Sequence, residues 1–372
     1  MTKQTLHVVS LPHTQTTSEY VACAYTQKVV KFCTMMKSLG YRVILYAGTE
    51  NEADCDEFVT IVSDDQKRLW FGDYDFHRFF FNITWDRNDD HWRQSNAKAA
   101  YEIRKRSSRR DIICLIGGVC QQDIALALPE LMCVEFGIGY SGVFAPFKVW
   151  ESNAWMHHVY GMMGQDVNGK FFDMVIPNYF DPIDFEFNPN KEDYYLFIGR
   201  VIKRKGIEIA VKATKDIGVL KVAGQGAVFE DDLLVADDIT LSGDHIDFVG
   251  YANKRKRSDL LSKAKAVFVP TLYIEPFGGV NVEAQLCGTP VVTTDFGAFT
   301  ETVEDGVTGF RCHTLGEFRK AAQDVGQLDP HYIRDRAEKL YSMNSVRYMY
   351  DKFFWRLSLL WEEGWYSNKV YQ

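Results

Sequence analysis

One stretch decides the fold: Glu275-Pro276-Phe277-Gly278-Gly279-Val280-Asn281-Val282-Glu283, in which two carboxylates eight residues apart enclose a pair of glycines. Residues 279–287 predict a short helix, because Gly288 supplies a left-handed stop and the β-branched run 291–294 predicts a strand. Backbone N–H groups at the start of a helix have no intrahelical partner, and the helix dipole favours anions there. A carboxylate at each end of a phosphate cradle suits a nucleotide sugar, with the diphosphate in the middle.

Further motifs surround this stretch in a fixed order. Two strands end in glycine turns, a third ends in Gly-Tyr, and two glycine-containing segments follow the second carboxylate. In chain order they are Phe197-Ile198-Gly199-Arg200 with Lys205-Gly206-Ile207, Leu220-Lys221-Val222-Ala223-Gly224-Gln225-Gly226, Ile246-Asp247-Phe248-Val249-Gly250-Tyr251, and Gly297-Ala298-Phe299-Thr300-Glu301 with Asp305-Gly306-Val307-Thr308-Gly309-Phe310. A single motif of this kind would be weak evidence, whereas the whole series in order is strong.

Over residues 177–311 the chain resembles retaining glycosyltransferases with the two-domain GT-B fold, particularly the large family four with its E-x7-E motif. The resemblance implies an α/β fold of two doubly wound, Rossmann-like domains that face a cleft. It implies transfer of a sugar from a nucleoside diphosphate donor to an acceptor hydroxyl with retention of anomeric configuration, without cofactor or metal. Asp73-Tyr74-Asp75 has the spacing of a metal motif but lies in an aromatic-rich segment.

The same resemblance assigns the grip on the diphosphate to Arg200 and Lys205, which flank a strand-to-helix turn. Two cations there would neutralise charge that develops on the leaving phosphate. The alternative is a solvated turn, because residues 203–205 form a short charge run. In the functional interpretation Lys203 and Arg204 face solvent.

By resemblance, Glu283 is expected to accept hydrogen bonds from ribose hydroxyls and Glu275 to contact hydroxyls of the sugar. For Glu283 the alternative is an acid favoured only by the helix dipole. The remaining donor-binding residues are expected to be Phe277, Gly278, Gly279 and Val280 at the sugar and phosphate, and Gly224, Gly226 and Tyr251 near the base. For the last three, ordinary turn chemistry is the alternative.

Two loops of the amino-terminal half depart from the family pattern. Many relatives carry a glycine pair after the first strand, where this chain has residues 11–18 with His13 as a candidate catalytic residue. Many also carry a histidine where this chain has Glu135, which could orient the acceptor or stabilise positive charge at the anomeric carbon. The alternatives are an exposed loop histidine and a carboxylate that caps nearby backbone N–H groups.

Alternating strand and helix patterns indicate parallel doubly wound sheets in both halves. In the first half, strands are expected at 6–11, 41–46, 111–116 and 131–135, and a helix at 22–38. The predicted domains are an acceptor-side domain at 1–178, a nucleotide-sugar domain at 179–343, and a crossing-back helix at 344–372. The tail at 331–365 is expected to be helical, with a buried face of Val346, Met349, Tyr350, Phe353, Phe354 and Leu357.

Composition sets broad limits. A chain of 372 residues suits two domains of about 180 residues each. The net charge of −8 argues against a general attraction to nucleic acid. The eight cysteines show no C-x-x-C pair, which favours buried reduced thiols in a cytosolic compartment. Neither a leader pattern nor an apolar run of membrane-spanning length is evident, so a cytoplasmic protein is expected.

Several interpretations stay open. The aromatic-rich segment 70–92 could form an acceptor platform, although a core-plus-lid explanation is favoured. The basic clusters 104–110 and 254–257 could contact lipid or nucleic acid, so peripheral membrane contact stays open, although a solvated helix face is favoured. The acceptor could be a glycan, a lipid-linked sugar or a modified nucleic-acid base. Alternatives to transfer are a nucleotide-sugar epimerase of the same architecture and a non-catalytic nucleotide-sugar-binding module.

Overall fold

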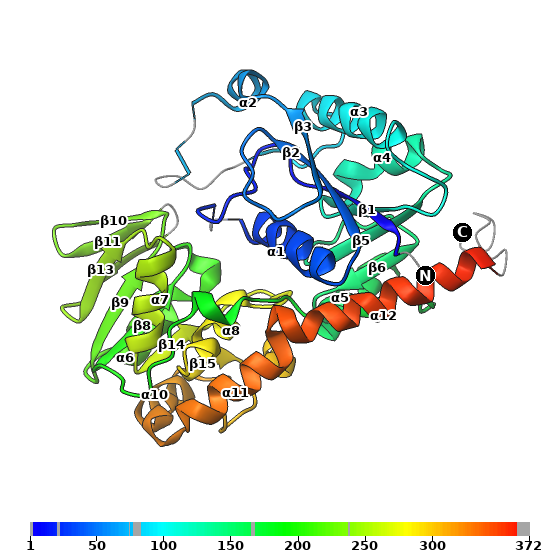
Figure 1. Cartoon of the computed structure of the whole chain (residues 1–372). Helices are drawn as coiled ribbons and strands as arrows, with labels where there is room; N and C mark the ends of the chain where they lie inside the picture. Colours follow the sequence, from blue (N-terminus) through cyan, green and yellow to red (C-terminus); the bar gives the residue numbers. More distant parts are fainter. Residues whose placement is uncertain are drawn as a thin grey trace.

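The amino-terminal half is built on a parallel sheet whose described strands follow the order β3-β2-β1-β4-β5-β6-β7 (Figure 1). The computed structural model describes residues 3–20, 23–73, 75–76, 83–164, 168–236 and 239–362. The strands are β1 (Thr5–Val9), β2 (Arg42–Gly48), β3 (Glu57–Val62), β4 (Ile112–Leu115), β5 (Met132–Ile138), β6 (Phe147–Trp150) and β7 (Met174–Val175). The helices are α1 (Ala24–Ser38), α2 (Asp64–Phe71), α3 (Asp90–Arg104), α4 (Gln122–Ala127) and α5 (Asn153–Met163).

The carboxy-terminal half repeats this plan with a parallel sheet in the order β13-β9-β8-β14-β15-β16. Its strands are β8 (Tyr194–Ile198), β9 (Val219–Ala223), β13 (Ile246–Gly250), β14 (Ala266–Val269), β15 (Val291–Thr294) and β16 (Gly309–Cys312). Its helices are α6 (Ile207–Thr214), α7 (Lys254–Lys263), α8 (Gly279–Leu286), α9 (Phe299–Thr302), α10 (Leu315–Asp324) and α11 (Pro330–Tyr341). The predicted fold class, two Rossmann-like α/β domains, is confirmed.

A small antiparallel sheet, which the sequence analysis did not predict, follows β9. It consists of β10 (Ala227–Glu230), β11 (Leu233–Ala236) and β12 (Ile239–Ser242). Asp231 and Asp232 join the first two strands, with φ of 49° and 61°. Two positive φ values at the centre of a two-residue loop match the backbone twist that a tight hairpin needs.

The predicted tail helix is in fact two helices, α11 and α12 (Met343–Glu362), separated by Ser342 in an extended conformation. At this break the chain runs beside its own earlier crossing between the halves. The N–H of Phe180 donates to the carbonyl of Tyr341 at 2.9 Å, and the N–H of Met343 donates to the carbonyl of Phe180 at 2.8 Å. The predicted end of the tail at residue 365 lies outside the described residues.

Helix α12 returns to the amino-terminal half and completes its core (Figure 1). The buried face consists of Val346, Tyr350, Phe353, Phe354, Leu357 and Leu360. They pack with residues such as Phe32 of α1, whose ring centre lies 5.2 Å from that of Tyr350. The prediction for Met349 was wrong, because this side chain lies at the margin of the apolar stripe and is 36% exposed.

Two further sequence predictions concern the cysteines and the apolar character of the helices. All eight cysteines are free thiols, and six of them are buried. None of the helices in the described ranges is both long enough and apolar enough to cross a bilayer.

Candidate functional site

A cleft of about 1070 Å³ separates the two halves. Its lining comes from the loops that follow β1, β4, β5 and β6 in the first sheet and β8, β9, β13 and β14 in the second. All of these loops leave the carboxyl ends of parallel strands, which is where doubly wound sheets bind ligands. We call the lining residues up to 178 the amino-terminal wall and those from 179 onward the carboxy-terminal wall.

Helix α8 gives the carboxy-terminal wall its shape. Its N-cap is Gly278, which adopts the left-handed conformation with φ of 76°. A Cβ at this position would come within 2.6 Å of the Phe299 ring, so glycine is required here. The predicted residues Phe277, Gly278, Gly279 and Val280 all line the cleft at the start of the helix. Backbone N–H groups that lack intrahelical partners are therefore presented to the cavity.

The first carboxylate of the motif, Glu275, is held beside Lys205. The Lys205 ammonium lies 3.0 Å from the Glu275 carboxylate and also donates to the Tyr273 hydroxyl. The Tyr273 ring in turn lies 4.3 Å from the guanidinium of Arg204. Arg204 is exposed, as predicted, and it also lines the cleft. Tyr273 thus joins two cations to Glu275, and burial raises the pKa of its phenol.

The second carboxylate, Glu283, is held by a different cation. The Arg257 Nε donates to Glu283 Oε2 at 2.6 Å, and both residues line the cleft. Arg257 belongs to the basic cluster 254–257, whose favoured interpretation was a solvated face. In the same cluster, Lys254 pairs with Asp184 at 2.8 Å. Part of this cluster therefore serves the cleft.

Arg200 follows β8 and lines the cleft, where burial lowers the pKa of its guanidinium. Gly224 also lines the cleft and lies against Gly199, because a Cβ on Gly224 would come within 1.7 Å of the Gly199 carbonyl oxygen. Tyr251 lines the cleft as well. Gly226 is not among the lining residues, so the prediction for this glycine has no support from the cavity.

His13 lines the amino-terminal wall but is nearly buried. Burial lowers the pKa of its imidazole to about 3, and the neighbouring charges of His91 and Lys67 act in the same direction. The ring lies edge-on to Trp85, with 6.0 Å between centres. His13 is therefore a neutral part of an aromatic wall at physiological pH.

Glu135 does not line the cleft and is fully buried. Its carboxylate accepts hydrogen bonds from the N–H groups of Phe144 and Ala145 at 2.9 and 2.8 Å, and from the Tyr140 hydroxyl at 3.2 Å. Burial raises the pKa of this carboxyl to about 7. These contacts match the alternative interpretation, a carboxylate that caps a loop, and they correct the assignment of Glu135 as catalytic.

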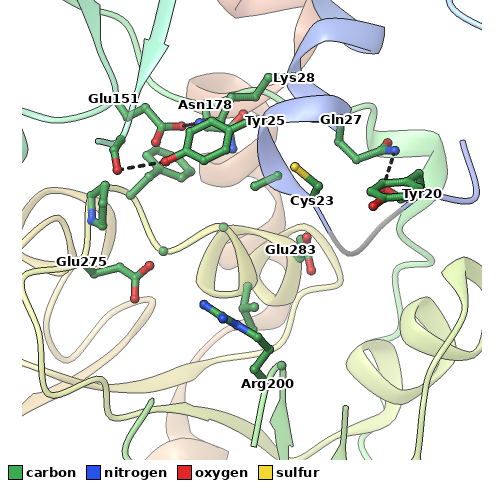
Figure 2. A pocket seen from close by; sticks show the side chains of 18 of the residues that line it. Tyr20, Cys23, Tyr25, Gln27, Lys28, Glu151, Asn178, Arg200, Glu275 and Glu283 are labelled. Atoms are coloured by element: carbon green, nitrogen blue, oxygen red, sulfur yellow. Dashed lines mark hydrogen bonds and ion pairs between the residues drawn. The ribbon is translucent and has the colours of Figure 1, made fainter. Parts of the chain in front are cut away.

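A buried ion pair in the amino-terminal wall was missed by the sequence analysis. The Lys28 ammonium lies 2.5 Å from the Glu151 carboxylate, and both side chains are nearly inaccessible. Burial raises the pKa of Glu151, with Lys28 opposing and Glu275 reinforcing this shift. Figure 2 shows Tyr25, Lys28 and Glu151 on one side of the cleft, and Arg200, Glu275 and Glu283 on the other. Glu151 follows β6, a strand that was not predicted, so its place at a strand end could not be seen.

Two polar contacts join the halves beside the cleft. The Ser152 hydroxyl donates to the carbonyl of Pro276 at 2.6 Å. The Glu301 carboxylate accepts from the N–H groups of Asn153 and Ala154 at 3.0 and 2.7 Å, at the first turn of α5. A carboxylate is favoured at this end of a helix. Helix α5 is therefore capped by a residue of the other half.

The two halves, the cleft between them and the returning helix define the GT-B fold of glycosyltransferases. Sucrose-phosphate synthase from Thermosynechococcus elongatus superposes with a TM-score of 0.67 at 17% identity, over 95% of this chain and 99% of that one. Anabaena Alr3699/HepE, solved in complex with UDP-glucose, gives a TM-score of 0.63 at 16% identity, over 96% of this chain and 100% of that one.

The sequence relation is confined to part of the chain. Residues 181–324, which carry most of the carboxy-terminal wall, match the family described as glycosyl transferases group 1. The D-inositol 3-phosphate glycosyltransferase of Mycolicibacterium smegmatis is 30% identical over 151 residues, which cover 38% of this chain and 34% of that protein. The chain thus spans about a third of the length of this curated relative.

Proposed function

We propose that this protein transfers a sugar from a nucleoside diphosphate donor to an acceptor hydroxyl, with retention of anomeric configuration. One observation carries the proposal: the carboxylates Glu275 and Glu283 lie on either side of the cleft-lining start of α8, and each is held by a cation. Anion-binding N–H groups between two hydroxyl acceptors match the chemical order of a nucleotide sugar. The group 1 match over residues 181–324 supports this assignment.

In this proposal the cations exchange partners when the donor binds. Lys205, held by Glu275 in this structure, turns to the diphosphate together with Arg200. Glu275 then accepts hydrogen bonds from hydroxyls of the transferred sugar. Glu283, oriented by Arg257, accepts hydrogen bonds from the ribose. Fixed cations beside the leaving group stabilise the negative charge that develops as the glycosidic bond breaks.

The transfer step needs one new bond and one proton movement. The acceptor oxygen bonds to the anomeric carbon on the face that the diphosphate leaves, and the bond from that carbon to the phosphate oxygen breaks. The acceptor proton passes to the departing phosphate oxygen. Front-face attack of this kind retains configuration without an enzymic nucleophile. Because Arg200 and Lys205 supply the positive charge, we propose that no metal takes part.

The compartment belongs to the proposal as well. Eight free thiols, six of them buried, favour a reducing environment such as the cytosol.

The first donors to test are UDP sugars, because a protein of the same fold was solved in complex with UDP-glucose. A calorimetric screen of nucleoside diphosphates should give one base that binds, and its sugar adducts should then be incubated with candidate acceptors. Mass spectrometry should show a glycosylated product, and the anomeric proton coupling in NMR should match that of the donor. Inverted configuration, or an epimerised nucleotide sugar as the only product, would contradict the proposal.

A further inference from the structure

The two walls of the cleft carry different charges among the described lining residues. The carboxy-terminal wall has more cations than carboxylates; they are Arg200, Arg204, Lys205, Lys254 and Arg257 against Asp184, Glu275 and Glu283. The three carboxylates are each paired with one of these cations. The wall therefore keeps a positive excess, as a diphosphate site requires.

The amino-terminal wall carries less charge, and most of it is compensated. Lys28 is neutralised by Glu151 within 2.5 Å. The other lining cation is Lys31, whose ammonium lies 4.8 Å from the centre of the Phe180 ring. Burial lowers the pKa of Lys31, and the charge of Glu283 is the largest opposing influence. The rest of this wall, in the part that the structure describes, is neutral.

An aromatic surface occupies the outer part of the same wall. Trp85 lines the cleft and is 52% exposed. The buried Trp92 supports it from behind, with 5.4 Å between ring centres, and is itself fixed by a hydrogen bond from its Nε1 to the Thr84 carbonyl at 3.1 Å. His13 closes one edge. Trp85 is therefore a supported ring with an open surface.

We propose that the acceptor is an uncharged carbohydrate and that one of its rings packs on Trp85. This inference rests on the proposed function and narrows the three acceptor classes that the sequence left open. A lipid-linked diphosphate or a nucleic acid would bring phosphates to a wall that offers, among its described lining residues, a single cation beyond the Lys28–Glu151 pair, and such ligands depend on several surplus cations. A saccharide needs instead a rigid apolar surface with hydrogen-bonding groups at its edge.

The test measures saccharide binding with the nucleoside diphosphate already bound. An array of neutral oligosaccharides is compared with phosphorylated saccharides, a polyprenyl diphosphate sugar and single-stranded oligonucleotides. We expect binding to neutral oligosaccharides only, with an affinity that changes little as ionic strength rises. An array in which only anionic ligands bind, or in which no neutral saccharide binds, overturns the proposal.

Variants locate the binding surface. Trp85→Ala should weaken saccharide binding on the order of tenfold, and Trp85→Phe should restore most of it. The matched control is Trp355→Ala, since Trp355 is 58% exposed on α12 and does not line the cleft. Equal saccharide affinity in Trp85→Ala and Trp355→Ala overturns the proposal, provided that both melt at the wild-type temperature.

The two proposals fail in different ways. Calorimetry with nucleoside diphosphate reports on the carboxy-terminal wall alone and should be unchanged in all three variants. If no nucleotide binds the wild type, the proposed function fails, whereas loss of saccharide binding with intact nucleotide binding concerns only Trp85.

Discussion

The two walls of the cleft differ in how they are built as well as in charge. The carboxy-terminal wall concentrates its two motif carboxylates and the first N–H groups of α8 within residues 275–283, on one loop and one helix. The amino-terminal wall draws on separate loops, and among its described residues the one ion pair joins Lys28 of α1 to Glu151 after β6. A diphosphate can be held by local backbone geometry, so its site leaves a motif in the sequence. A neutral ring is held by shape, which leaves none.

The largest expected effect is on turnover and comes from a substitution in the carboxy-terminal wall. Lys205→Ala removes a cation that we place beside the leaving phosphate, so turnover should fall about 100-fold or more and affinity for free nucleoside diphosphate should fall with it. Steady-state kinetics and calorimetry measure the two quantities. Lys203→Ala is the control, because Lys203 is exposed and does not line the cleft. Unchanged nucleotide affinity in Lys205→Ala would remove this residue from the site.

The next effect concerns the second carboxylate. Glu283→Gln keeps the shape of the side chain but loses the charge that should accept the ribose hydroxyls. Hydrogen bonds to charged groups contribute about 1.5–3 kcal/mol, so donor affinity should fall about tenfold or more. The control is Glu304→Gln, since Glu304 pairs with Arg336 away from the cleft. If Glu283→Gln bound the donor as tightly as this control does, the ribose assignment would be wrong.

A pH series tests the protonation state of His13 in the amino-terminal wall. The pKa of His13 lies near 3 in the folded protein and near 6.5 when unfolded, so the unfolded state takes up a proton first as pH falls. The contribution of His13 to stability is therefore complete above pH 6.5 and is lost progressively towards pH 3. At pH 5 the loss should reach about 2 kcal/mol relative to pH 7.

Urea unfolding of wild type and His13→Gln at pH 7 and pH 5 measures this loss. The quantity compared is how much the free energy of unfolding of each protein changes between the two pH values. Glu135→Gln serves as the opposite control, because the raised pKa of Glu135, about 7, makes its contribution fall as pH rises from 4.5 to 7. If wild type and His13→Gln lost the same stability between pH 7 and pH 5, the imidazole would take up a proton in the folded protein as readily as in the unfolded state, and the lowered pKa of His13 would be wrong.

The smallest effect is expected from metal removal, which should leave turnover nearly unchanged. Exhaustive chelation with EDTA should change turnover less than twofold, since Arg200 and Lys205 are proposed to supply the charge that a divalent ion would otherwise provide. A loss of activity that Mg²⁺ or Mn²⁺ restores would show that Arg200 and Lys205 do not supply enough positive charge without a metal.

The sequence predicted the carboxy-terminal wall much better than the amino-terminal wall. Both carboxylates, Lys205 and the glycine turns could be found because each occupies a fixed place relative to a strand end. Their partners Tyr273 and Arg257 could not, since an ion pair between a loop and another helix has no spacing rule. Glu135 misled because the predicted strand ended at residue 135, whereas β5 continues to Ile138 and the carboxylate accepts from Phe144 and Ala145 instead of lining the cleft. Burial of such a carboxylate depends on loop shape, which sequence periodicity does not report.

The crossing of the chain between the halves has a mechanical consequence. The outgoing segment at Phe180 and the returning segment at Ser342 form a parallel bridge, so the two chain segments that join the halves lie side by side. A joint of this kind permits rotation about one axis and resists sliding of one half along the other. A small rotation at this bridge would move residues distant from it by a larger amount. Elsewhere between the halves, the Gln225 side chain donates to the Phe76 carbonyl at 2.8 Å. We therefore expect this contact to part when the halves open and to re-form when a ligand is enclosed.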